Sequence, residues 1–334
     1  LSTSASASST HRRRPRSSSS TTTFAPHRKS FDNYPYIVAG HNLRGRLLLC
    51  ASQGPGPNPK AYILCDAVTC RAVRLPDPAP VLRRSIVNPA NAFLFGDNIV
   101  VKLQPPTANT NAALLCYRTG FPNPRGNGWF VLNINYPPAH RPWGAHGTTF
   151  HDNKIWWLDL SHGLLYADFK TLRKLSFVAL PPGSELQPGT PDLDKRRCVG
   201  VSAGALRYVR IHRLRGRDGK CMQAVSVWTL IDDETTTGKR WRRDCRTPFQ
   251  WIWDDDGYKN TKLKPEVPAV ALFHPNHGGV VYFLQKPRML GVDVLAGRVL
   301  EWQYFTMLHP PLAYHSLWFI RAWELGPAPR PHAF

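Results

Sequence analysis

Long apolar runs are missing from this 334-residue sequence. A helix that crosses a membrane needs about 18 consecutive apolar residues. The most apolar candidate, residues 317–325, is interrupted by Arg321 and Glu324. We therefore expect no membrane contact and a soluble body, in which the hydrophobic residues, 42% of the chain, build a large packed core.

Cysteine pairs of the kind that bind metals or carry redox chemistry are also missing. The seven cysteines stand at positions 50, 65, 70, 116, 198, 221 and 245 and form no C-x-x-C pair. Three lie in apolar runs, Leu49-Cys50, Leu64-Cys65 and Leu115-Cys116, which is typical of buried thiols in a reducing compartment. The sequence contains no N-glycosylation sequon. These features predict an intracellular protein, of the cytoplasm or nucleus, without a structural zinc site.

Acidic residues are scarce, with 22 Asp and Glu against 43 Lys and Arg and a formal net charge of +21. Residues 1–30 hold six basic residues and no acid, and residues 195–246 hold fourteen Lys or Arg against five Asp or Glu. A basic balance of this size favours acidic partners or nucleic acid. A solvated basic face together with a basic tail is the plainer interpretation of the same charges.

Residues 1–30 differ in composition from the rest of the chain. They contain ten Ser and five Thr with almost no large apolar residue, so they cannot bury enough surface to offset the entropy of ordering. We predict a disordered head over 1–30, with an organelle transit peptide as the alternative. Residues 31–327 are predicted to form one propeller-like domain, and residues 328–334 a short tail.

A short apolar pattern recurs from residue 36 onwards and marks five units. Each unit begins with a turn residue and continues as a strand-like run, and the central residues of successive runs are 52, 56, 51 and 74 positions apart. We expect these anchors to be buried at equivalent positions of five strands. The anchors are Leu47, Ile99, Ile155, Leu206 and Val280.

A second apolar run follows each anchor, and a third run closes most units, indistinctly in the fourth unit near Trp241. In four units the second run ends on an aspartate, whose carboxylate can accept backbone N–H bonds two or three residues further on and fix a tight turn. These residues are Asp66, Asp168, Asp232 and Asp293. Repeats of this kind are typical of propeller blades. We predict an all-β, propeller-like array of antiparallel blades, with a β-sandwich as the alternative.

Several of these segments resemble one known family. They read HRPW at 140–143, HDNKIWWLDLS at 151–161, GLL at 163–165, FVALPPGSEL at 177–186, RCVGVSAGALRY at 197–208, VWTL at 227–230 and RAWEL at 321–325. In this order, over about residues 31–327, the chain resembles the plant family called domain of unknown function 1618. More distantly it resembles the kelch-like domains that follow F-boxes in plant ubiquitin-ligase adaptors. The resemblance implies a plant origin and a propeller-like body, and it transfers no catalytic residue.

The segment GVSAG at 200–204 matches the G-x-S-x-G pattern of a nucleophile elbow. A true elbow leads from a strand into a helix, whereas residues 206–211 alternate in the manner of a strand. We therefore predict a strand–turn–strand segment around Ser202, with no imidazole within hydrogen-bonding reach of its hydroxyl. A hydrolase that uses Ser202 is the least favoured function. P-loop and GxGxxG motifs are missing, so no cofactor is expected.

Thirteen histidines raise the question of a metal site. The closest pair is His274 and His277, but the Pro and Gly residues around them indicate a loop rather than a helical turn that could chelate a metal. His146, His151 and Asp152 cluster before a strand, where capping and packing roles are expected. We predict no metal at either place.

Two pairs of tryptophans are candidates for contacts between blades or with a partner. Trp156 and Trp157 are adjacent and would point to opposite faces of a strand, one into the core and the other to the surface or under a neighbouring sheet. Trp251 and Trp253 alternate, which in a strand would place both on one face. Interface hot spots are enriched in tryptophan, although packing between blades is the plainer role.

Architecture and charge together favour a non-enzymatic, adaptor-like scaffold that binds a protein partner, expected to be acidic, through blade loops. Clustered cations around Gly216 and Gly219 predict a flexible hairpin tip on the fourth unit. The candidate contacts are Arg213, Arg215, Arg217, Lys220, Trp251 and Trp253. The alternative is a nucleic-acid-binding protein that uses the basic residues of 195–246. It is weakened because Arg207 and Arg210 would point to opposite faces of a strand.

Overall fold

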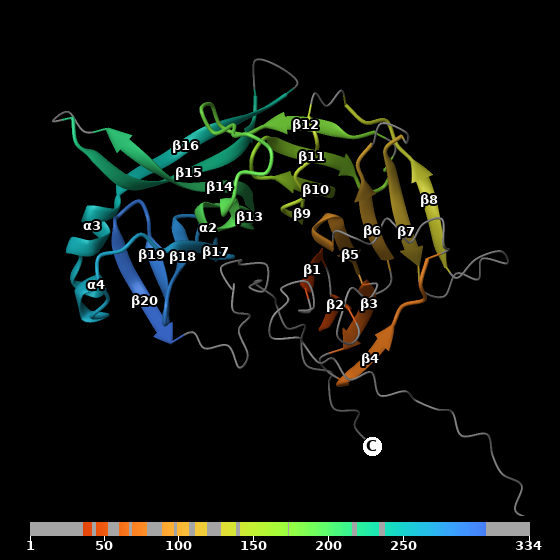
Figure 1. The fold of residues 1–334 in the computed structure, drawn as a ribbon, viewed down its shortest axis with the longest axis horizontal. Coiled ribbons are helices and arrows are strands. Elements are labelled where there is room, and N and C mark those ends of the chain that lie inside the picture. Colours follow the sequence, from red (N-terminus) through yellow and green to blue (C-terminus); the bar gives the residue numbers. More distant parts are fainter. Residues whose placement is uncertain are drawn as a thin grey trace, which may run out of the picture.

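The computed structural model describes residues 36–41, 45–52, 60–66, 69–78, 89–96, 99–106, 111–118, 128–137, 141–172, 174–215, 219–233 and 238–304. Within them, twenty strands form five four-stranded units, which we call blades 1 to 5 in chain order. Figure 1 shows the blades following one another around a curve. The prediction of an all-β, propeller-like array is confirmed. The predicted head, residues 1–30, and the predicted tail, residues 328–334, lie outside the described residues.

Blades 1 and 2 share one eight-stranded sheet. The first three residues of β1 pair antiparallel with β2, and its last three pair parallel with β5, so this one strand belongs to both blades. The short 3-10 helix η3 (Pro89–Asn91) precedes β5. Blade 1 contains β1 (Tyr36–His41), β2 (Arg46–Ser52), β3 (Lys60–Asp66) and β4 (Arg71–Arg74), and blade 2 contains β5 (Ala92–Phe95), β6 (Ile99–Gln104), β7 (Ala113–Arg118) and β8 (Trp129–Asn133).

Blades 3, 4 and 5 are separate antiparallel sheets whose strands lie in chain order. Blade 3 contains β9 (Gly147–His151), β10 (Lys154–Asp159), β11 (Gly163–Asp168) and β12 (Ser176–Ala179), and blade 4 contains β13 (Arg197–Ser202), β14 (Ala205–Arg215), β15 (Cys221–Asp232) and β16 (Lys239–Pro248). Blade 5 contains β17 (Ala269–Phe273), β18 (Val280–Gln285), β19 (Arg288–Asp293) and β20 (Arg298–Tyr304). Three short helices accompany these blades: α2 (Leu193–Arg196), α3 (Phe249–Asp254) and α4 (Asp256–Asn260).

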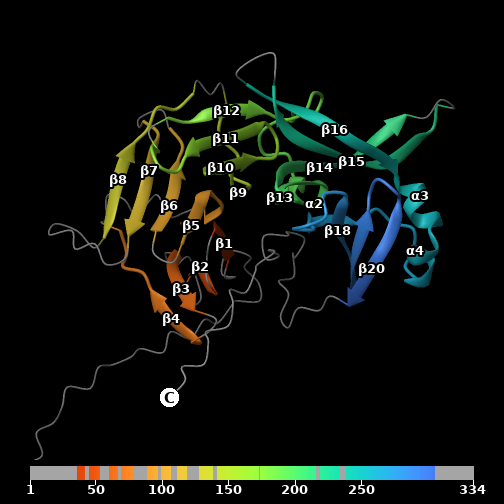
Figure 2. The same ribbon diagram turned by 180° about the vertical axis from the view of Figure 1, so that it is seen from behind.

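The first strand of each blade lies on the inner side of the array. Strands β1, β5, β9, β13 and β17 lie next to one another, as Figures 1 and 2 show from opposite sides. The hydrophobic core is correspondingly divided into four clusters, each of which joins two consecutive blades. Stability of the array therefore depends on packing between neighbouring blades as well as on pairing within each blade.

All five anchors fall in the second strand of a blade, as predicted. Ile155, Leu206 and Val280 are buried, but Leu47 and Ile99 are only half-buried. In blade 1 the interior positions are taken instead by Leu48 and its neighbours on the same face, which pack towards blade 2. Leu47 points to the other face, which no preceding blade covers within the described residues. The expectation of burial was wrong there because it assumed that every blade has a neighbour on both faces.

The turn role predicted for the strand-ending aspartates is confirmed in three blades. Asp66 accepts the backbone N–H of residue 69 at 3.0 Å, Asp168 that of residue 170 at 2.8 Å, and Asp293 that of residue 296 at 3.0 Å. Asp232 differs because its carboxylate pairs with the Lys239 ammonium across the hairpin. Three of the five blades therefore use the same local device to join their third and fourth strands.

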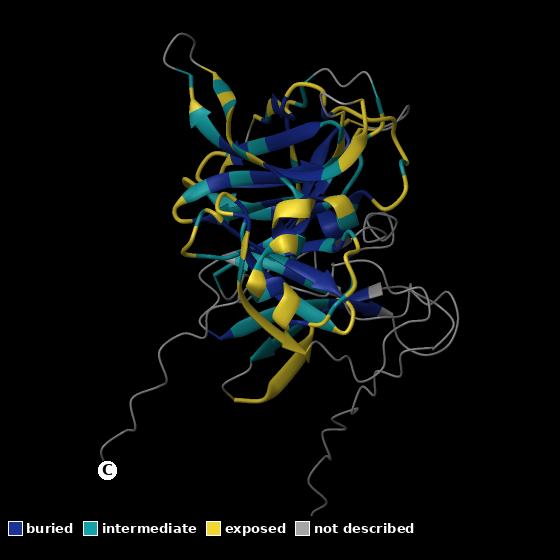
Figure 3. Ribbon diagram, turned by 90° about the vertical axis from the view of Figure 1, so that its left-hand side faces the viewer, coloured by how far each residue is buried: buried dark blue, intermediate teal, exposed yellow. Residues whose placement is uncertain are grey.

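Both members of the adjacent tryptophan pair are buried between blades. Trp157 packs with the core that joins blades 2 and 3, whereas Trp156 packs with the core that joins blades 3 and 4. The prediction of opposite faces is confirmed, and both faces are covered by a neighbouring sheet. Figure 3 shows the same trend, with burial greatest in the middle strands and exposure greatest along outer strands and hairpin ends.

The seven cysteines all lie in described residues and form no disulfide with one another. Cys50 and Cys116 are buried as expected, and burial raises the pKa of Cys116 to about 12, whereas Cys65, near the end of β3, is only half-buried, so the expectation was wrong there. Cys70 and Cys221 are exposed, because each stands at the start of a strand beside a hairpin turn. No helix in the described ranges is long and apolar enough to cross a membrane.

Candidate interaction site

Ser202 ends β13, and its surroundings are those of a tight hairpin. Ala203 and Gly204 have φ values of 47° and 71° and turn the chain directly into β14. The buried Ser202 hydroxyl donates to the main-chain carbonyl of His274 at 2.6 Å and so joins blade 4 to blade 5. The predicted strand–turn–strand context is confirmed, and the partner of the hydroxyl is a main-chain oxygen rather than an imidazole.

His146 and His274, two of the histidines considered above, accept hydrogen bonds from backbone N–H groups of nearby loops. Nδ1 of His274 accepts the backbone N–H groups of Asn276 and His277 at 3.0 and 3.2 Å. Nδ1 of His146 accepts the backbone N–H of Leu160 at 3.2 Å. Among the described residues, no group of three or more His, Cys, Asp or Glu side chains is arranged to hold a metal ion.

Trp251 and Trp253 do not share a strand face, so that prediction was wrong. They lie in α3, where Phe249 and Ile252 turn into the core between blades 4 and 5, and Trp253 stacks on Phe249 with ring centroids 6.0 Å apart. Successive positions in a helix are about 100° apart, so residues two apart point to different sides. Trp251 is 60% exposed. Gly297, in the turn between β19 and β20, packs closely against the Cβ of Trp251.

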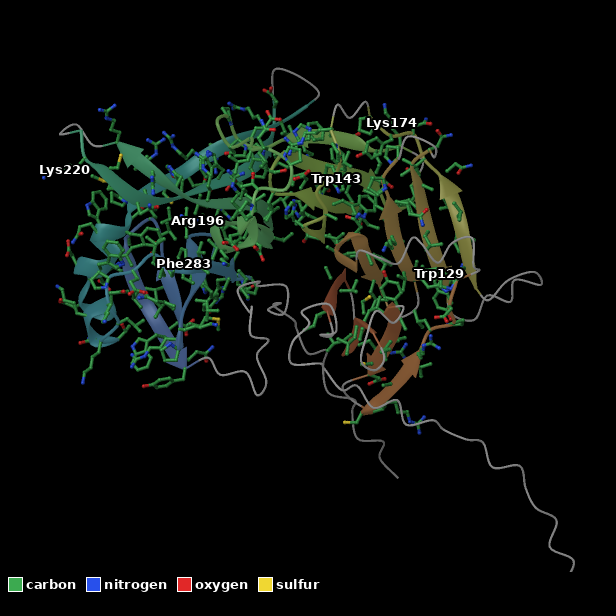
Figure 4. The ribbon with its side chains drawn as sticks, in the orientation of Figure 1. Trp129, Trp143, Lys174, Arg196, Lys220 and Phe283 are labelled. Carbon is green, nitrogen blue, oxygen red and sulfur yellow. The ribbon has the colours of Figure 1, made fainter. Side chains whose placement is uncertain are left out.

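The hairpin of β14 and β15 extends beyond the rest of blade 4. Its strands have 11 and 12 residues, and β16 ends opposite Ala224, before the tip. Arg213, Arg215 and Lys220 are exposed along this extension, and Figure 4 shows Lys220 at its end. The predicted projecting hairpin is confirmed, whereas Arg217 lies outside the described residues. Arg213 and Arg215 share the sheet face that α3 covers further down the blade.

The loop of residues 181–186, which follows β12, was not predicted to be of interest. Three arginine side chains donate hydrogen bonds to its main chain. We call it the clamped loop. The guanidinium of Arg197, the buried first residue of β13, donates from Nη1 to the carbonyls of Leu160 and Ser184 at 2.7 and 2.6 Å. Burial lowers the pKa of Arg197, which nevertheless stays far above neutrality as arginine does. The side chain of Arg197, in blade 4, therefore connects this blade to main-chain carbonyls of blade 3 and of the loop that follows it.

Arg141 and Arg210 complete this arrangement. Arg141 donates to the Leu186 carbonyl at 2.7 Å and to the Ser161 hydroxyl at 2.5 Å. Arg210 donates from Nη1 to the Gly183 carbonyl at 2.6 Å and to the Ser184 hydroxyl at 2.9 Å. Hydrogen bonds from a charged donor are stronger than neutral ones. The clamped loop is therefore fixed by side chains of both neighbouring blades.

Asp159, at the end of β10, organises the strand end beside Arg141. Its fully buried carboxylate accepts the backbone N–H of Gly144 at 2.8 Å and both the backbone N–H and the hydroxyl of Ser161, at 2.8 and 2.6 Å. A Cβ on Gly144 would lie 2.9 Å from this carboxylate, so the loop can approach only without a side chain there. Sequence reasoning missed these roles, although Asp159, Ser161, the clamped loop and Arg197 belong to the segments 151–161, 177–186 and 197–208 that carry the family resemblance.

Solved structures similar to this chain include propellers and glycosidases. The chain is 10% identical to YCF48 from Cyanidioschyzon merolae, covering 78% of this chain and 67% of that one with a TM-score of 0.38. It is 11% identical to an α-L-arabinanase from Penicillium chrysogenum in complex with arabinobiose, covering 80% of each chain with a TM-score of 0.39. For the β-propeller domain of the Trilobed protease from Pyrococcus furiosus, identity is 6%, coverage 81% and 85%, and the TM-score 0.35.

Among curated proteins, none matches the sequence significantly. One family model matches residues 157–282, the segment that runs from β10 through blade 4 to β18 and contains the clamped loop, Arg197 and Arg210. Its description is protein of unknown function, DUF1618. The match to this family is confined to residues 157–282, where the motifs of the segment had indicated the same family.

Proposed function

We propose that this protein is a non-enzymatic scaffold that binds an acidic protein partner through one side of blade 4 and helix α3. The observation that carries the proposal is the extended hairpin of β14 and β15. Its outer part packs against no third strand, and it carries exposed Arg213 and Arg215 on one face. Neither guanidinium forms an ion pair within the described residues. Cations on a projecting tip repel one another and gain little stability, so a binding role accounts for them better.

Trp251 supports the same surface. It is a large aromatic side chain, mostly exposed, on the helix that covers the face of blade 4 from which Arg213 and Arg215 project. Leu295, in the neighbouring turn between β19 and β20, is 69% exposed and adds apolar area beside it. Exposed tryptophan and arginine side chains are the residue types enriched in protein-binding hot spots. We call the set of Arg213, Arg215 and Trp251 the hairpin surface.

The thiol chemistry of the chain supports a location inside the cell, where we place this function. Burial raises the pKa of Cys116 to about 12 and that of Cys245 to about 11, so both remain protonated and unreactive near neutral pH. Seven cysteines that form no disulfide are typical of a reducing compartment.

The test compares two variants with the same change in charge. One is Arg213→Glu/Arg215→Glu, on the hairpin surface, and the other is Arg71→Glu/Lys170→Glu, at exposed positions of blades 1 and 3. Partners are captured with the wild-type protein from plant tissue, the source that the family resemblance implies, and are identified by mass spectrometry. Association of a purified partner is then measured at low and at physiological salt.

We expect the hairpin variant to associate about tenfold more slowly at low salt and the control variant to match the wild type. The difference should shrink at physiological salt, where screening acts over about 8 Å. Trp251→Ala should speed dissociation instead. Equal association rates of the two charge variants at low salt would refute the proposed surface.

A further inference from the structure

The face of blade 4 opposite the hairpin surface carries a second group of cationic side chains. Cross-strand register places Arg210 and Arg246 on either side of Ser226, and it places Arg243 beside Trp228 in the next row on the same face. His212 lies on this face as well, and its Nε2 is 2.9 Å from the Ser226 hydroxyl. We call Arg210, His212, Arg243 and Arg246 the basic cluster.

The basic cluster contains no compensating carboxylate. Neither Arg243 nor Arg246 forms an ion pair or side-chain hydrogen bond within the part of the chain that the structure describes. Arg210 is held by the clamped loop and lies over the Trp228 ring, 5.4 Å from its centroid. Its Nε atom is buried and has no hydrogen-bond partner among the described residues. A buried N–H donor without an acceptor is costly, so the local fold holds Arg210 in place at some expense of stability.

The electrostatics of His212 support this interpretation. Burial lowers the pKa of His212, and the charges of Arg210, Arg246 and Arg243 lower it further, whereas a hydrogen bond with the Arg213 carbonyl acts the other way. Burial also lowers the pKa of Arg210, with Arg246 adding to the effect. The only charged groups that act on His212 among the described residues are thus arginines. The charges of Arg210, Arg243 and Arg246 repel one another and disfavour the protonated form of His212, and a bound anion would relieve that repulsion.

We propose that the basic cluster binds a single tetrahedral anion, the phosphoryl group of a phosphorylated side chain on the protein partner. The phosphoryl oxygens would accept hydrogen bonds from the guanidinium groups of Arg210, Arg243 and Arg246. Directly opposite side chains in a sheet are about 5 Å apart at Cβ, so Arg210 and Arg246 begin about 10 Å apart on either side of the buried Ser226, close enough for their guanidinium groups to reach one phosphoryl group. This inference rests on the proposed partner-binding function.

A nucleic acid fits the same face less well. Successive phosphates need a continuous basic track, and here the cations divide between two faces of the sheet. Arg213, Arg215, Arg240 and Arg242 point to the opposite side from the basic cluster. The cluster spans two rows of one sheet, with the clamped loop next to Arg210. These dimensions favour one compact anion over a polyanion.

The experiment measures binding of inorganic phosphate by calorimetry with the full chain at constant ionic strength, with chloride as the reference anion. The test variant is Arg243→Gln/Arg246→Gln. The control is Arg240→Gln/Arg242→Gln, which removes the same charge from the same strand, β16, but from its other face. We expect the test variant to lose phosphate affinity at least tenfold and the control to stay within twofold of the wild type. Equal losses in both variants, or no phosphate binding by the folded wild-type protein, would overturn the proposal.

A second set of measurements identifies the source of the phosphoryl group. A phosphoserine peptide should bind more tightly than its unphosphorylated form, and the test variant should remove the difference. Tighter binding of a single-stranded oligonucleotide than of the phosphopeptide, lost in the same variant, would overturn the phosphoprotein assignment in favour of nucleic acid. If Arg213→Glu/Arg215→Glu associates with the partner as fast as the control variant, the phosphate measurements still test the basic cluster. If the wild-type protein does not bind phosphate, the association measurements still test the hairpin surface. The two proposals can therefore fail separately.

Discussion

Replacing Arg197 by methionine should destabilise the protein more than any exposed arginine substitution. The guanidinium is buried, and its Nη1 donates to the carbonyls of Leu160 and Ser184 at 2.7 and 2.6 Å. Methionine keeps most of the volume but leaves both carbonyls without their donor. An unsatisfied buried acceptor costs about 1–3 kcal/mol, and relief from burying a charge offsets part of the total. We therefore expect a loss of about 2–4 kcal/mol in the free energy of unfolding.

The matched control is Arg196→Met, one residue earlier at an exposed position of α2 that Figure 4 labels. An exposed substitution of this kind should change stability by about 0.5 kcal/mol or less. Urea unfolding, followed by tryptophan fluorescence, measures both variants against the wild type. Hydrogen exchange at the Ser184 and Leu186 amides should rise in Arg197→Met, because the clamped loop loses a support. A difference between the two variants below about 1 kcal/mol would refute the assigned role of Arg197.

Two further predictions concern packing and protonation. A Cβ at Gly163 would lie 2.5 Å from both the Phe177 ring and a backbone carbonyl, so Gly163→Ala should cost about 1–3 kcal/mol in urea unfolding. Gly279→Ala, where the nearest atom is 3.7 Å away, should be nearly neutral, and equal losses would contradict this. His212 has a pKa below its ordinary value of 6.5, so the unfolded chain takes up its proton first and stability falls as the pH drops below about 6.5. His212 contributes at most about 1.4 kcal/mol per pH unit to the slope of the free energy of unfolding against pH. His212→Gln should reduce that slope by this contribution, and an unchanged slope would contradict a lowered pKa of His212.

The blade pattern could be predicted from the sequence because its signals are local. A turn residue, an alternating run and a closing aspartate lie within about twenty residues of one another, and the hydrogen bonds of Asp66, Asp168 and Asp293 follow from that spacing. The opposite faces of Trp156 and Trp157 follow from strand geometry alone. These features need no knowledge of which blades are neighbours.

The errors arise where distant residues decide the structure. Trp251 and Trp253 have a spacing that suggests a strand, but burial of Phe249 and Ile252 against blades 4 and 5 selects a helix. Arg197 finds its acceptors 37 and 13 residues away, and no local pattern identifies them. Of the candidate surfaces, the sequence therefore indicated the hairpin arginines and Trp251, whereas the clamped loop and the basic cluster depend on the packing of blade 4 against blade 3.

The sharing of β1 between two blades has a consequence for how the molecule opens. Because β1 pairs with both β2 and β5, blades 1 and 2 cannot separate without breaking main-chain hydrogen bonds. Blades 3, 4 and 5 are separate sheets, which are joined to their neighbours through side-chain packing and through isolated main-chain hydrogen bonds between loops, such as those from Leu175 to Asn135 and from Ala203 to Pro275. Amide exchange should accordingly divide the chain into cooperative units of unequal size, with the first two blades opening as one and the later blades opening singly. A partner that binds blade 4 would then contact a unit that can open or close locally while blades 1 and 2 stay folded.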